Sequence, residues 1–116
     1  MSGATSYHAG LAAEEQVSRL YQRDGKTLVA QRWRGKGGEI DLIMRDGAQV
    51  IFIEVKQSRT HDLAAQHLGP RQIARIYAAA AEFVEGEPLG QLTDVRLDAA
   101  LVDAMGQIEI LQNFAA

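Results

Sequence analysis

The fold is decided by two neighbouring stretches of the sequence, GEIDLI at residues 38–43 and IFIEVK at residues 51–56. Both are apolar, strand-like runs that contain charged residues where a plain core strand would have none. Asp46 and Gly47 lie between them, and Asp-Gly between apolar runs is a strong signal for a two-residue hairpin turn. We therefore expect an antiparallel hairpin in which Asp41 faces Phe52.

The alternation of side chains along a strand gives this hairpin two different faces. One face is fully apolar, and we expect it to pack under a helix. The other face carries Asp41, Glu54 and Lys56. In the expected register Asp41 and Glu54 are diagonal neighbours, roughly 7–8 Å apart at the backbone, so their carboxylates can converge on one ion. The apolar face consists of Ile40, Leu42, Met44, Ile51, Ile53 and Val55.

The order of the charged residues points to a reaction class. Asp41 is followed after a gap of 12 residues by Glu54, and Lys56 comes after one intervening residue. Two carboxylates can hold a hard cation, and a lysine beside them suits a reaction at a phosphate. This is the sequence form of a metal-dependent phosphodiesterase site.

Composition limits the class of protein. A chain of 116 residues with 47% hydrophobic content is expected to form one domain over residues 1–116 with a substantial core. It has no cysteine, which excludes disulfides and thiolate metal sites and fits a reducing cytoplasm. We expect no signal peptide and no membrane partner, because no apolar stretch is long enough for either.

The basic residues are concentrated in the first part of the chain. Residues 1–75 hold 11 Lys and Arg against 8 Asp and Glu, whereas residues 76–116 hold 1 against 7. A polyanion could approach the basic part, although a solvated loop and helix end would give the same pattern. The candidates for nucleic-acid contact are Arg32, Arg34, Lys36, Arg71 and Arg75.

The remaining pattern predicts an α/β fold with a mixed sheet flanked by helices, in the order α-β-β-β-α-β-β. Helices are expected at about residues 8–24 and from Pro70 to about residue 85, because apolar residues recur there with helical spacing. Strands are expected at about residues 27–34, in the hairpin, and at residues 94–102 and 107–111. Residues 58–69 are polar and are expected to form a loop.

The first helix offers a third carboxylate. Leu11, Glu14, Val17 and Tyr21 fall on one face at spacings of three and four, whereas Glu15 falls on the solvent side. An ionised group among apolar neighbours is costly unless it is paired. Glu14 therefore needs a partner. A metal site at the strand ends is one candidate, and an arginine at the rim of the helix is the alternative.

Further motifs occur in order along nearly the whole chain: Gly10 with Glu14, Gly25, Arg75-Ile76 with Ala79-Ala80, Arg96-Leu97-Asp98, and Asn113-Phe114. With GEIDLI and FIEVK, which are the most specific, they resemble the YraN-type family of small bacterial proteins. That family is classed among predicted endonucleases of the PD-(D/E)xK superfamily and is similar to Holliday-junction resolvases.

The resemblance implies a restriction-endonuclease-like fold in which Asp41 and Glu54 bind Mg²⁺ or Mn²⁺. It implies that Lys56 orients or activates the attacking water and steadies charge on the phosphate, and that Glu14 completes the metal shell. Hard cations prefer the oxygen ligands that these residues supply.

Two departures from the family pattern concern substrate contacts more than the metal centre. Arg71 and Gln72 occupy the start of the second helix, where a lysine is expected. Leu97 lies between Arg96 and Asp98, where an aromatic residue is usual.

Two classes of function remain open. The first is a metal-dependent nuclease that acts on nucleic acid, with branched or structured DNA as the implied substrate. A homodimer would suit it, since junction cutters must reach two strands. The second is a non-catalytic nuclease-fold module that binds nucleic acid or a protein partner. The net charge of −3 favours the second slightly, whereas the presence of all four site residues favours the first.

Overall fold

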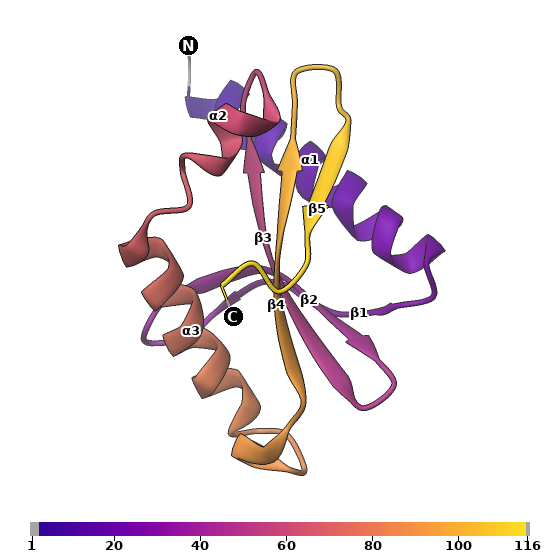
Figure 1. Cartoon of the computed structure of the whole chain (residues 1–116), viewed down its shortest axis with the longest axis vertical. Helices are drawn as coiled ribbons and strands as arrows, with labels where there is room; N and C mark the ends of the chain where they lie inside the picture. Colours follow the sequence, from indigo (N-terminus) through magenta and orange to yellow (C-terminus); the bar gives the residue numbers. More distant parts are fainter. Residues whose placement is uncertain (1–2, 116) are drawn as a thin grey trace.

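The chain folds into a twisted five-stranded sheet with helices on both faces, and the computed structural model describes residues 3–115, with side chains from residue 10 onward (Figure 1). The element order agrees with the one expected from the sequence, with the short helices α2 and η1 in addition. The helices are α1 (Gly3–Arg23), α2 (His61–Ala65), α3 (Pro70–Val84) and the 3₁₀ helix η1 (Gly90–Leu92). The strands are β1 (Thr27–Arg34), β2 (Glu39–Asp46), β3 (Gln49–Gln57), β4 (Val95–Val102) and β5 (Ile108–Leu111).

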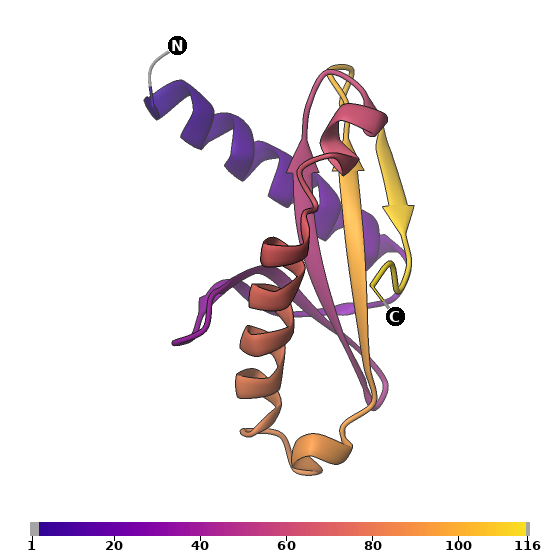
Figure 2. The same ribbon diagram turned by 60° about the vertical axis from the view of Figure 1, so that its left-hand side comes forward.

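The strands follow their order in the chain, β1-β2-β3-β4-β5. Only β3 and β4 are parallel, and the other neighbours in this described sheet are antiparallel. A parallel pair needs a long crossover. Here the chain leaves the end of β3, passes through α2, α3 and η1, and returns along β4 (Figure 2). The sheet is therefore mixed, as the sequence predicts.

The hairpin between β2 and β3 forms, but its turn lies one residue later than predicted. Asp46 pairs with Gln49, so Gly47 and Ala48 make the turn. Gly47 has a φ of +60°, the value required at the first turn position of type II′, whereas type I′ would need positive φ at both positions. Phe52 consequently pairs with Ile43 rather than with Asp41. The register differs by two residues, so the side chains of the paired residues 42–46 and 49–53 keep their predicted faces.

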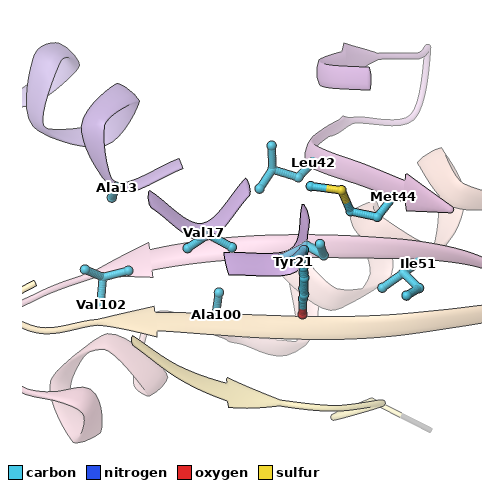
Figure 3. Packing of buried hydrophobic residues seen from close by; sticks show 9 residues of the cluster. Ala13, Val17, Tyr21, Leu42, Met44, Ile51, Ala100 and Val102 are labelled. Carbon is cyan, nitrogen blue, oxygen red and sulfur yellow. The ribbon is translucent and has the colours of Figure 1, made fainter. Parts of the chain in front are cut away.

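The apolar face of the hairpin packs under α1, as expected. Val17 and Tyr21 of the helix are buried against Leu42, Met44 and Ile51 of the strands (Figure 3). Ile53 belongs to the same cluster, and Val55 lies partly buried beside it.

One predicted member of that face, Ile40, packs on the other side of the sheet. The pairing of β2 with β3 ends at Leu42–Ile53, and Ile40 pairs only with Trp33 of β1. Because β2 has left β3 at this point, the alternation of the hairpin no longer fixes the direction of Ile40. Its side chain joins the cluster under α3. The buried members of that cluster are Ile40, Ile43, Val50, Phe52, Ile76, Ala79, Ala80, Val84 and Leu97.

Residues 58–69 contain a short helix that the sequence analysis missed. Thr60 caps α2, since its hydroxyl accepts a hydrogen bond from the Leu63 amide. Ala64 is fully buried and anchors the helix to the sheet. The Thr60 cap is a recognisable start signal, but five residues are too few for helical periodicity to stand out.

The motif Arg96-Leu97-Asp98 builds a buried polar network. Asp98 is fully buried and accepts hydrogen bonds from the Tyr21 hydroxyl at 2.7 Å and from the Asn113 amide at 3.0 Å. Arg96 makes a two-pronged ion pair with the same carboxylate. Burial and the Asp98 carboxylate raise the pKa of Tyr21, so its hydroxyl stays protonated and donates. The network ties α1 and the C-terminal segment to β4.

In the described part of the chain, no helix combines the length and the apolar character that a bilayer crossing requires.

Candidate active site

A cavity of ≈ 350 Å³ opens where β2 and β3 separate, between α1 and the start of α3. Beyond the last paired residues the two strands diverge, and side chains from both strands can reach the space between them. Three of the predicted site residues, Asp41, Glu54 and Lys56, line this cavity together with Glu14. The other lining residues are Gly38, Glu39, Val55, Gln72 and Arg75.

Asp41 is held at the point where the β2–β3 pairing stops. Its Oδ2 accepts a hydrogen bond of 2.8 Å from the backbone amide of Val55. The last paired residues are Leu42 and Ile53. Beyond the end of the ladder, the Asp41 carboxylate is the acceptor for the Val55 amide. This hydrogen bond fixes the orientation of the Asp41 side chain in the cavity that Glu54 also lines.

Glu54 is almost fully buried, with 4% of its surface exposed. Burial and, to a lesser extent, the neighbouring Asp41 carboxylate raise the pKa of Glu54 to about 9. Lys56 and the Gln72 amide only partly offset these effects. In the absence of a cation this shift favours the protonated form of Glu54, as expected for two carboxyl groups that share one site.

Lys56 lies on the same strand face as Glu54 and next to it. Its Nζ is 3.8 Å from Glu54 Oε2, and its side chain is 22% exposed at the cavity. The ammonium group is therefore available to a molecule that enters the cavity and carries negative charge.

Glu14 faces inward and Glu15 is exposed, in agreement with the helical period. The partner of Glu14 is Arg32, whose Nε and Nη2 donate to Oε1 and Oε2 at 3.0 and 3.1 Å. Of the two alternatives for Glu14, the arginine is the one observed. In this arrangement both oxygens of Glu14 are engaged, and Arg32 is directed to Glu14. Among the described side chains, no group of three or more His, Cys, Asp or Glu residues has an arrangement that could hold a metal.

Gln72 is a site residue that sequence reasoning missed. Its Nε2 donates a hydrogen bond to Glu54 Oε2. Gln72 lies in the first turn of α3, two residues after Pro70, which starts the helix. Its place near the helix start was visible in the sequence, but its contact depends on where α3 lies against the sheet.

The five predicted nucleic-acid contacts lie on β1, on the loop that follows it and on α3. Arg75 is exposed and lines the cavity, and Arg71 is exposed on the same helix. Arg34 pairs with Glu39 at 3.1 Å while its side chain remains 79% exposed. Lys36 is exposed. Of the five candidates, only Arg75 lines the cavity, and nucleic-acid contact stays a prediction for all of them.

The glycines before β2 let a loop lie directly on α3. A Cβ atom at Gly37 would be 2.9 Å from the Ala78 Cβ, and one at Gly38 would be 3.2 Å from the Arg75 carbonyl oxygen. The Lys36 amide donates to Glu82 Oε1 at 2.9 Å. This close packing holds the rim of the cavity against the helix that supplies Gln72 and Arg75.

A second cavity, of ≈ 400 Å³, lies beside the C-terminal end of α1. Two of the cationic side chains that line it are already paired, Lys26 with Asp24 and Arg96 with Asp98. Asp24 is the one carboxylate among the described residues that line it. The described lining of this second cavity therefore lacks the two neighbouring carboxyl groups that line the first.

A model of the UPF0102 family, described as an uncharacterised protein family, matches residues 13–102. The chain belongs to the UPF0102 family. This is the YraN-like family that its motifs resemble. The matched residues include every side chain that lines the candidate site.

Relatives of the UPF0102 family align over almost the entire chain. A UPF0102 protein of Cereibacter sphaeroides strain KD131 is 62% identical over 117 residues, which cover 100% of both chains. One from Ruegeria pomeroyi is 56% identical, over 96% of this chain and 90% of its own. One from Dinoroseobacter shibae is 39% identical, over 96% and 83%. Their names state no activity.

Proposed function

We propose that this UPF0102 protein is a metal-dependent nuclease of the PD-(D/E)xK type. The observation that carries the proposal is the meeting of Asp41, Glu54 and Lys56 on one cavity that is open to solvent. A carboxyl pair in which one member has a strongly raised pKa is typical of functional sites. A purely structural role would leave this pair without a compensating gain.

The donor set fits a hard divalent cation such as Mg²⁺ or Mn²⁺, which prefers oxygen ligands and accepts water in the remaining positions. Asp41 would bind through Oδ1, because Oδ2 accepts the Val55 amide, and Glu54 would supply the second carboxylate. When bound, the cation would lower the pKa of its water and stabilise negative charge on the phosphate.

The protein's own residues have distinct roles around that position. Lys56 contributes a positive charge at the cavity, where it holds the phosphate or orients the attacking water. Gln72 fixes the direction of the Glu54 carboxyl group. Arg75, exposed at the rim, is placed to contact a phosphate of the nucleic-acid backbone.

The proposed substrate is nucleic acid, with branched or structured DNA first. The cavity is open, and the cationic side chains that line it, Lys56 and Arg75, could contact phosphates once a bound cation offsets its carboxylates. A homodimer would place two such sites against two strands. A cytoplasmic location agrees with a chain that has no cysteine.

The second candidate is a non-catalytic module on the same fold that binds nucleic acid or a protein. It is favoured by the Glu14–Arg32 pair, which neutralises the third carboxylate without a metal. Under this alternative Glu54 would remain protonated and structural.

A cleavage assay tests the two candidates. The protein would be incubated with Mg²⁺ or Mn²⁺ and labelled DNA in single-stranded, duplex and four-way branched form. RNA substrates of the same three forms would be tested in parallel. We expect cleavage that EDTA abolishes and that Asp41→Asn removes. Glu15→Gln is the matched control, because it removes an exposed carboxylate next to Glu14 and should cleave normally. Equal activity of the Asp41→Asn variant would reject the proposed site, and no cleavage of any substrate would favour the non-catalytic module.

A further inference from the structure

The ion pair between Glu14 and Arg32 lies at the edge of the candidate site and differs from an ordinary surface pair. The guanidinium group bonds both carboxylate oxygens, and the Glu14 side chain is only 14% exposed. A two-pronged pair of this kind fixes orientation as well as charge. The pair therefore determines where the Glu14 carboxylate points.

The backbone at Arg32 is unusual in a way that supports a specific role. Arg32 has a φ of +49°, which is uncommon for residues other than glycine, although Gln31 and Trp33 on either side both pair with β2. Such a conformation persists only where the surrounding structure determines it. It changes the direction in which the Arg32 side chain leaves the strand, and the side chain reaches Glu14.

The charge of the Glu14 carboxylate interacts with the charges of the proposed cation site. It lines the same cavity as Asp41 and Glu54. Burial, and after it the Asp41 carboxylate, raises the pKa of Glu14, whereas Arg32 opposes the shift. If Glu14 were released from Arg32, the cavity would present three carboxylates in addition to Glu39, which pairs with Arg34. With Arg32 in place, the Glu14 carboxylate is neutralised and directed towards the guanidinium group.

We propose that Arg32 is a positioning residue that keeps Glu14 out of the ligand set of the cation. The inference rests on the proposed function, since it concerns the cation of the same site. It assigns Asp41 and Glu54 as the ligands and leaves Glu14 bound to the arginine. The affinity for the cation is then set by the Glu14–Arg32 pair, because hard cations bind more tightly as the charge of their ligands increases.

The test is a double-mutant cycle in which Mn²⁺ binding is measured by isothermal titration calorimetry, without nucleic acid. Arg32→Ala releases Glu14 and should bind Mn²⁺ about tenfold more tightly than the wild type, the size of effect typical for residues that orient metal ligands. Glu14→Gln alone removes a negative charge beside the site while Arg32 keeps its positive one, so it should lower the affinity by less than tenfold. In the double variant the gain should disappear, which shows that it passes through Glu14.

Two further variants separate positioning from a general effect of charge. Arg75→Ala removes another positive charge from the same cavity without touching Glu14, and it should give a much smaller gain. Arg32→Lys keeps the charge but loses the two-pronged geometry, so it should show part of the gain. It also serves as the test if Arg32→Ala does not fold.

Each alternative outcome is distinct. If the wild type binds Mn²⁺ and releasing Glu14 changes nothing, the inference is wrong while the proposed function stands. If Glu14→Gln alone loses tenfold or more, Glu14 is already a ligand and the inference is wrong. Absence of Mn²⁺ binding in every variant rejects both the inference and the metal site.

Discussion

The Asp41 carboxylate accepts the backbone amide of Val55 at 2.8 Å, just beyond Leu42 and Ile53, the last residues that pair β2 with β3. A single side chain therefore ends a strand ladder and at the same time leaves its second oxygen for the cavity that Glu54 shares. Asp41 therefore has two roles, in the backbone hydrogen bond and in cation binding. Mutation can separate them, because the hydrogen bond needs an acceptor oxygen whereas cation binding needs a negative charge.

We expect Asp41→Asn and Asp41→Ala to have opposite effects on stability. Asparagine keeps an acceptor for the Val55 amide and removes the charge that opposes ionisation of Glu54, so the apo protein should be as stable as the wild type or more stable. Alanine leaves the amide without a partner and should cost about 1–3 kcal/mol. Both variants should lose cleavage. Urea unfolding with EDTA present measures the difference, and equal destabilisation by both would contradict this account.

A second prediction concerns the pH dependence of Glu54. Its pKa is raised to about 9 in the folded protein, so the folded state binds a proton that the unfolded state releases at lower pH. The free energy of unfolding should therefore fall as pH rises from about 5 towards 9, at up to roughly 1.4 kcal/mol per pH unit for this proton. Glu54→Gln should lack this slope and should be the more stable protein at pH 8.

Chemical denaturation of both proteins at several pH values checks the effect of Glu54. The difference between the two profiles isolates the one group, because all other titrating residues are shared. Parallel profiles would show that Glu54 is ionised in the folded protein at neutral pH.

Strand alternation explains why much of the fold and site could be predicted from the sequence. Alternation places Glu54 and Lys56 on one face of β3, and a register error of two residues does not change that. Asp41 lies just beyond the last paired residues and reaches the same cavity, where its carboxylate accepts the Val55 amide hydrogen bond. The start of α3 was similarly predictable, because Pro70 suits the first turn of a helix.

Other features depend on tertiary placement that no local pattern encodes. Ile40 changes sides because β2 leaves β3 at Asp41, and the departure point is set by packing. The helical spacing of the sequence marks Glu14 as a group that needs a partner, but it leaves the choice between a metal and an arginine open. The choice of Arg32 depends on a positive φ, which no sequence pattern predicts for an arginine.

The buried Asp98 network gives a third prediction, on stability alone. Tyr21→Phe removes a 2.7 Å hydrogen bond to a fully buried carboxylate, and should cost about 1.5–3 kcal/mol, the range for hydrogen bonds to charged groups. Cleavage per folded molecule should not change, because the network lies outside the candidate site. Tyr77→Phe is the control, since it removes a hydrogen bond from an exposed hydroxyl to the Ala115 carbonyl oxygen and should have a smaller effect. Denaturant unfolding of both variants gives the comparison.

The last prediction separates cation binding from turnover at Lys56. Mg²⁺ bound by Asp41 and Glu54 should stabilise the folded protein by ~2.7 kcal/mol at a hundredfold excess over its dissociation constant. Lys56→Ala removes no oxygen ligand, so its thermal melts should still respond to millimolar Mg²⁺ or Mn²⁺ while its cleavage is lost. Asp41→Asn should lose the response and the cleavage together. If Lys56→Ala and Asp41→Asn respond alike to the cation, the division of roles between ligand and lysine is wrong, and an unresponsive wild type would support the non-catalytic module.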